Sequence, residues 1–242
     1  MVRVRLSAGD RVFDAVVAFV VALLAFVCLL PFVNIASVAF SSSEAVVSGR
    51  VSVFPIGFQS QSFSVVLNDA SMWRSFRFTV LLTATFTVLA MIATICAAYP
   101  LSQQRLRGRT PLLLLITFTM FFNGGLIPNY LLVRGLGLMD SMWALILPML
   151  VSTWNMIIMK SFFTALPAEL EESARIDGAN DIVILLRIIL PVSKPVIAAL
   201  SLFYAVGRWN GFQDAVFFIN DAAKYPLQLV LNQIVMRGEV DQ

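Results

Sequence analysis

The side chains that could do chemistry in this sequence gather in one segment, residues 166–191, which reads LPAELEESARIDGANDIVILLRIILP. Three carboxylates, Glu169, Glu171 and Glu172, fall within four positions. The sequence contains no histidine, which excludes serine–histidine catalysis and histidine-ligated zinc. It also contains no G-x-x-x-x-G-K-[ST] phosphate-binding loop. Two interpretations of the carboxylates stay open: a solvated connecting helix, or a surface that contacts another protein.

Two short helices joined at a glycine are expected to position these carboxylates. Pro167 suits the first turn of a helix, because its missing N–H would be unpaired there. The three glutamates then lie in the N-terminal half of that helix, where the macrodipole favours negative charge. Gly178 stands where a helix ends in a left-handed residue, and Asn180 can cap the next helix. We expect that second helix to run over Asp181–Leu190 and Pro191 to end it.

Composition places this segment in a membrane protein. The 242 residues are 59% hydrophobic and 13% charged, against about 45–50% and about 25% in soluble domains. The apolar residues form blocks close to the ~20 residues that a membrane-spanning helix needs. We predict an all-α, polytopic membrane protein with one domain over residues 1–242. Its expected spans are residues 12–33, 78–98, 111–133, 141–163 and 195–218.

Polar and aromatic residues in or beside these spans are the candidates for a passage. The third block is interrupted by NGGLIP, residues 123–128, and irregular backbone at membrane depth is tolerated only where it is buried in protein or lines a cavity. A packing kink is the alternative interpretation. A neutral polar solute such as a sugar needs stacking faces and amide partners. The candidates of these types are Asn123, Asn155, Trp209 and Asn210.

Basic residues indicate the orientation. The leader, the loop over residues 101–110 and the segment over residues 160–194 hold ten of the seventeen lysines and arginines. Because an excess of basic residues in short loops marks the cytoplasmic side, we expect the N-terminus and residues 164–194 to be cytoplasmic. The net charge of +3 is spread along the chain, without the basic stripe of a nucleic-acid-binding protein.

The segment over residues 171–191 resembles a known motif. Its EESARIDGANDIVILLRIILP is similar to the cytoplasmic "EAA" loop of permease subunits of bacterial ATP-binding-cassette (ABC) importers. That loop reads Glu-Ala-Ala, three residues, Gly, nine residues, then Ile-x-Leu-Pro. Every spacing is kept here, and serine replaces one alanine. The matching residues are Glu172, Ser173, Ala174, Gly178, Ile188, Leu190 and Pro191.

The resemblance extends over residues 13–233 and implies a function. The flanking sequence resembles the carbohydrate branch related to the maltose-transporter permease, most of all permeases for complex oligosaccharides that work with lipoprotein binding proteins. The resemblance implies a second permease subunit in a heterodimer, an ATPase dimer that carries ATP and magnesium, and a sixth span. After residue 219 the sequence shows no further block of spanning length, so we expect five visible spans. A permease for amino acids or peptides, a secondary transporter and a membrane-embedded enzyme remain alternatives.

The resemblance also implies a role for each matching residue. Glu172 would be the polar anchor of the loop on the ATPase, Ser173 and Ala174 its closely packed face, and Gly178 its turn. Ile188, Leu190 and Pro191 would seat the second helix on the membrane domain. The ATPase would push this loop, and the two permease subunits would rock between inward-open and outward-open states around the solute.

Overall fold

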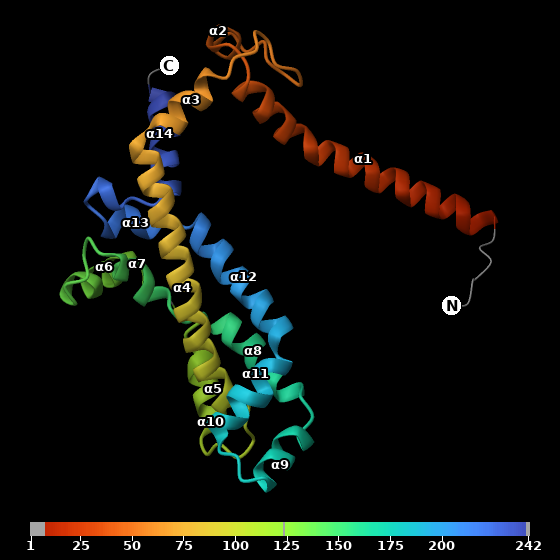
Figure 1. Cartoon of the computed structure of the whole chain (residues 1–242), viewed down its shortest axis with the longest axis vertical. Coiled ribbons are helices and arrows are strands. Elements are labelled where there is room, and N and C mark those ends of the chain that lie inside the picture. Colours follow the sequence, from red (N-terminus) through yellow and green to blue (C-terminus); the bar gives the residue numbers. More distant parts are fainter. Residues whose placement is uncertain (1–7, 123, 241–242) are drawn as a thin grey trace. The chain divides into compact units, whose positions relative to one another are not determined.

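The chain is built from helices and loops. The computed structural model describes residues 8–122 and 124–240, and no strand occurs among them. Two compact units, Met1–Ala70 and Ser71–Gln242, make up the chain (Figure 1). The all-α class predicted from the sequence is confirmed. The assignment of residues 1–242 to a single domain stays a prediction.

The first unit contains one long apolar helix and a short folded segment. Its helices are α1 (Ala8–Ala39), α2 (Ser43–Val47) and α3 (Gln61–Asn68). Val12–Ala39 is long and apolar enough to cross a membrane, so the first predicted span exists and continues beyond residue 33. After α1 the chain folds back. The Phe40 ring stacks on Phe58 and Phe63, and the Gln59 N–H donates to the Phe40 carbonyl at 2.9 Å.

The second unit is a helical bundle with several broken helices. In chain order its elements are α4 (Ala70–Ser102), α5 (Arg109–Phe118), α6 (Leu126–Gly135), α7 (Met142–Ile146), η1 (Leu147–Met149), α8 (Thr153–Ala165), α9 (Glu169–Ile176), α10 (Asp181–Ile184), η2 (Leu185–Ile189), α11 (Leu190–Val192), α12 (Lys194–Asn210), α13 (Gln213–Phe218), η3 (Ala222–Lys224) and α14 (Leu227–Val240).

The predicted spans are more broken than the sequence indicated. In the described part of the chain, two helices, Val12–Ala39 and Ala70–Ser102, meet the length and composition of a span. Two further spans are possible only if bent pairs count as one each: Met142–Met149 with Thr153–Ala165, at 52°, and Asp181–Val192 with Lys194–Asn210, at 82°. The described residues therefore contain two unbroken candidate spans, and five spans over the chain stay a prediction.

The third and fifth blocks show where continuity fails. Residues 111–133 divide into α5 and α6, of ten residues each, because the chain turns after Phe118 and passes through Gly125 with φ of 87°. A positive φ at that junction stops the helical pattern and suits glycine. Residues 195–218 divide into α12 and α13 at Gly211, which has an extended backbone.

Pro191 does not end its helix, contrary to the sequence prediction. Helix Asp181–Val192 continues past Pro191 and bends into α12 only at Ser193. Immediately before the proline, Leu185–Ile189 forms a π-helical turn. Proline lacks the N–H that a regular helix would use, and the wider i→i+5 turn changes the bonding so that the helix can continue.

Tyr204 links three elements at the centre of the bundle. Its hydroxyl shares a hydrogen bond of 2.7 Å with Thr94 Oγ1 on α4, and it accepts from the Ser152 N–H before α8 at 3.2 Å. The Tyr204 ring contacts Phe86 edge to face at 5.9 Å. Tyr204 belongs to the same buried core as the fully buried side chains Leu82, Leu145, Met159, Ile184 and Leu200. The Tyr204 hydroxyl therefore links α12 to α4 and to the start of α8.

Asp140 closes a corner between the loop after α6 and the segment after α13. It has φ of 59°, unusual outside glycine, and its Oδ1 accepts from the N–H groups of Asn220 and Asp221 at 3.1 and 3.0 Å. Lys224 Nζ donates to Asp140 Oδ2 at 3.1 Å. The Asp221 N–H, followed by Lys224, holds the pKa of the Asp140 carboxyl below its usual range, because both stabilise the charged form.

Candidate functional site

Helix α9 carries the carboxylates and displays one face. Glu172 and Ser173 are exposed, and Ile176 is 86% exposed. Ala174 instead packs into the core of this chain and is only 8% exposed. The expectation that Ser173 and Ala174 pack closely against the ATPase stays a prediction, and within this chain Ala174 packs inward. Positions 172, 173 and 176 share a helix face, whereas position 174 lies on the opposite one.

The turn after α9 has the predicted geometry. Gly178 has φ of 82°, and its N–H donates to the Arg175 carbonyl at 3.0 Å, as in a helix end with a left-handed residue. Asn180 Oδ1 accepts the Val183 N–H at 2.9 Å and caps α10. Both local predictions are confirmed. Pro167, by contrast, lies two residues before the first helical residue of α9, Glu169, rather than in its first turn.

The second helix of the segment, Asp181–Val192, packs on the core through residues of the EAA motif and also through residues outside it. Ile188 and Leu190 are half-buried against the core, whereas Pro191 is exposed. The fully buried side chains of this helix are Ile184 and Ile189. Their spacing of five residues places them on one face across the π turn.

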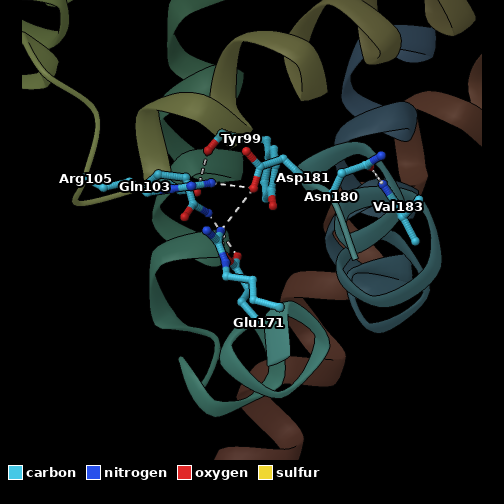
Figure 2. A network of polar contacts seen from close by, with 9 residues as sticks. Tyr99, Gln103, Arg105, Glu171, Asn180, Asp181 and Val183 are labelled. Atoms are coloured by element: carbon cyan, nitrogen blue, oxygen red, sulfur yellow. Dashed lines mark hydrogen bonds and ion pairs between the residues drawn. The ribbon is translucent and has the colours of Figure 1, made fainter. Parts of the chain in front are cut away.

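A polar network joins this segment to the loop after α4 (Figure 2). Gln103 Nε2 donates to Glu171 Oε1 at 2.9 Å, and Arg105 is ion-paired with Asp181. Arg175 donates to both carboxylates, at 3.3 Å to Glu171 Oε2 and at 3.1 Å to Asp181 Oδ1. Two cations and two carboxylates balance, so the network carries no net charge.

The candidates for a passage divide between two places. A cavity of about 570 Å³ is lined by residues of α4, α8 and α12 and by the α12–α13 break, and both Asn155 and Asn210 line it. Trp209 is not among the lining residues and contacts Phe76 on α4 edge to face at 6.0 Å. Asn123 lies outside the described residues. The structure thus brings together two of the four candidates.

A buried ion pair forms part of the wall of this cavity. Arg208 and Asp214 form two contacts of 2.6 and 2.9 Å, with side chains only 3% and 9% exposed. Arg208 also donates to the Leu145 carbonyl at 3.0 Å and to the Gly211 carbonyl at 3.1 Å. Four N–H groups of the guanidinium are engaged, so the pair fixes the α12–α13 break rather than offering a free charge.

Sequence reasoning did not identify the polar network or the buried pair as parts of the site. Arg105 and Asp181 are separated by 76 positions, so no local pattern joins them. Arg208 and Asp214 are six apart, and a continuous helix would not place them on neighbouring positions. The available signal was Gly211, which breaks the helix between them.

The whole chain is similar to proteins of known class, although no protein-family model matches it. It is 42% identical over 238 residues to the polygalacturonan/rhamnogalacturonan transport system permease protein YtcP of Bacillus subtilis, covering 96% of this chain and 83% of that protein. It is 42% identical over 232 residues to protein LplC of the same organism, covering 96% and 79%.

A solved structure is also similar. It is the crystal structure of a bacterial ABC transporter involved in the import of the acidic polysaccharide alginate, which matches with a TM-score of 0.88 and 36% sequence identity. The match covers 95% of this chain and 82% of that one. Sequence and fold therefore agree over nearly the whole chain.

Proposed function

This chain belongs to the permease subunits of ABC importers for sugars and polysaccharides, and from that premise we propose that residues 164–194 are its docking surface for a separate ATPase. It is an integral membrane protein and a transport subunit, not an enzyme. The observation that carries the proposal is the segment around Gly178: an exposed charged face, a left-handed turn, and a following helix anchored in the core.

The proposed docking face is defined by what α9 leaves exposed. Glu172 supplies a charge, Ser173 a small side chain that permits close approach, and Ile176 an apolar side chain that is 86% exposed. An isoleucine this exposed gains stability when a partner covers it, since burying an apolar side chain is worth about 1.5–3 kcal/mol. We assign Ala174 to the inner face, where it holds α9 on the bundle.

The proposed solute is an oligosaccharide. Relatives whose names state a solute include permeases for polygalacturonan/rhamnogalacturonan and for diacetylchitobiose, and the solved importer takes alginate. These names favour a carbohydrate over an amino acid or a peptide. The cavity beside Asn155 and Asn210 supports this, because it combines amides with the rings of Phe86 and Tyr204. Trp209 and Asn123 remain candidates without a place in that cavity.

Permease subunits of this family work with a second permease, an ATPase and a binding protein. For this chain we propose a heterodimer with the second permease, an ATPase dimer that holds ATP and magnesium, and a lipoprotein that delivers the sugar. The proposed orientation has the N-terminus and residues 164–194 in the cytoplasm of a bacterial cell, as the distribution of basic residues indicates. Membrane lipid surrounds the spans.

The test of docking is Gly178→Trp in the complete transporter. A Cβ added at Gly178 meets no atom of this chain within 4 Å, so this chain leaves room for the start of a side chain there, and the cost of the positive φ of 82° is measured by the control below. We expect normal insertion in the membrane, loss of the ATPase on co-purification and loss of sugar uptake. Ile176→Ser should weaken co-purification in the same direction.

Gly137→Trp is the matched control. Gly137 also has a positive φ, 68°, and an added Cβ there also meets nothing within 4 Å, so the backbone strain is comparable. It lies outside residues 164–194, and its variant should retain the ATPase. Sugar uptake by Gly178→Trp at the unmodified rate, or equal loss of the ATPase in both variants, contradicts docking at this segment.

A further inference from the structure

Apolar packing holds α9 to the bundle at few points. Among the eight residues of α9, all of which the structure describes, Ala174 is the one that is buried. Leu170, on the same stripe, is 38% exposed. A force on α9 would displace this helix alone, because only a few apolar contacts between α9 and the bundle have to separate. Something else must transfer a displacement of α9.

The polar network supplies contacts that run sideways from this segment. Glu171 on α9 and Asp181 at the start of α10 lie on the two sides of the Gly178 turn, and Arg175 joins them. Gln103 contacts the first carboxylate and Arg105 the second. Figure 2 shows these side chains converging from the end of α4 and from the α9–α10 corner. Both halves of the corner are thus tied to one segment.

That segment is itself fixed to α4. Gln103 and Arg105 directly follow the last residue of α4, Ser102. Four residues after Arg105, Arg109 Nε donates back to the Leu101 carbonyl at 2.8 Å and closes the loop. A force on Arg105 therefore reaches the end of the 33-residue helix α4 through a short, closed loop.

Open space flanks these contacts. A cavity of about 390 Å³ is lined by Gln103, Glu171 and Arg175, and one of about 530 Å³ by Gln103, Arg105 and Asp181. Long polar side chains bridge this space where apolar packing does not fill it. Exposed ion pairs contribute little to the stability of a fold, so the fold of this chain should tolerate their removal.

We propose that Gln103 and Arg105 are positioning residues that couple displacement of the α9–α10 corner to the end of α4. The proposal rests on docking of the ATPase at residues 164–194 and adds the route by which its movement reaches the membrane helices. Because the contacts are half-exposed and flanked by cavities, they can break and re-form between two arrangements of the corner.

The test is Arg105→Ala in the complete transporter in proteoliposomes, with ATP hydrolysed per sugar imported as the readout. We expect that ratio to rise roughly threefold, the effect of losing one exposed ionic contact, while the ATPase still co-purifies in normal amount. Gln103→Ala should act in the same direction. Arg107→Ala is the matched control, since Arg107 is an exposed arginine of the same loop with no ion pair recorded among the described residues, and it should leave the ratio unchanged.

A charge series separates coupling from simple loss of a side chain. Arg105→Asp should raise the ratio further, because it places a third carboxylate in the network, whereas Arg105→Lys keeps the positive charge beside Asp181 and should give a ratio lower than that of Arg105→Ala. An unchanged ratio in Arg105→Ala, or a ratio for Arg105→Lys as high as that for Arg105→Asp, overturns the proposal. Loss of the ATPase from Arg105→Ala also overturns it, since the residue would then serve docking. If the ATPase does not dock at residues 164–194, a different result reports it, namely sugar uptake at the normal rate by Gly178→Trp.

Discussion

Two ionic groupings in this chain differ in their surroundings more than in their chemistry. Arg208 and Asp214 are 3% and 9% exposed, whereas Arg105 and Asp181 are both 52% exposed. The buried pair is surrounded by carbonyl acceptors and holds a helix break in one geometry. The exposed network shares its carboxylates among several donors and borders two cavities. The buried pair is suited to holding one backbone geometry, whereas the exposed network is suited to transmitting a displacement between helices.

The largest effect should come from breaking the buried pair. Asp214→Ala leaves Arg208 without its countercharge in the interior, which costs about 3–5 kcal/mol of the free energy of unfolding. Asp181→Ala should cost about 0.2–1 kcal/mol, as for exposed pairs. Unfolding of both variants in the same detergent measures the difference.

A double replacement checks the cause. Arg208→Met with Asp214→Leu removes both charges, so it should be clearly more stable than Asp214→Ala. Equal losses in Asp214→Ala and Asp181→Ala would mean that burial does not distinguish the two groupings.

Salt should separate the two groupings by a smaller amount. Raising the ionic strength from about 0.05 M to about 0.5 M screens exposed charges and screens buried ones much less. The stability difference between the unmodified protein and Asp181→Ala should therefore shrink, while that for Asp214→Ala persists. Unfolding measurements at both ionic strengths provide the readout, and a matching decline in both differences would contradict the assignment.

The smallest effect on stability should come from Asp140, and it should appear when the pH is lowered. The folded protein holds the pKa of this carboxyl below its ordinary value of 3.8. Its contribution to stability is then present above the unfolded pKa and is lost as the pH falls through the folded pKa. The unmodified protein should exceed Asp140→Asn in unfolding midpoint at neutral pH, and the gap should narrow once the pH falls below the ordinary value of 3.8 and close below the folded pKa. Asparagine tolerates a positive φ, so the substitution removes the charge without adding backbone strain. A gap that is independent of pH would contradict this.

The sequence predicted what short-range chemistry determines. Gly178 and Asn180 act on atoms within a few residues, so their turn and cap could be predicted from spacing. The direction of Ala174 could not, because the rotation of α9 depends on which face meets the bundle. The same holds for Asn155 and Asn210, which share a cavity although they are far apart in sequence.

The continuity of the predicted spans depends on contacts that hydropathy does not describe. Hydropathy over residues 111–133 and 141–163 describes how apolar a segment is, not whether its backbone runs straight. Gly125 and Pro148 interrupt these helices, and at Pro191 a π turn let the helix continue where proline was expected to stop it. Breaks depend on how neighbouring helices satisfy the freed backbone groups, which a window average does not contain.

The 82° bend at Ser193 gives this segment a mechanical property. Helix Asp181–Val192 stands nearly at a right angle to α12, and its twelve residues span about 18 Å. A rotation of about 10° around that corner would displace the far end, beside Gly178, by roughly 3 Å. This geometry is that of a lever arm: a push at the turn would become a rotation at the start of α12, and the length of the arm would set how far the turn must travel.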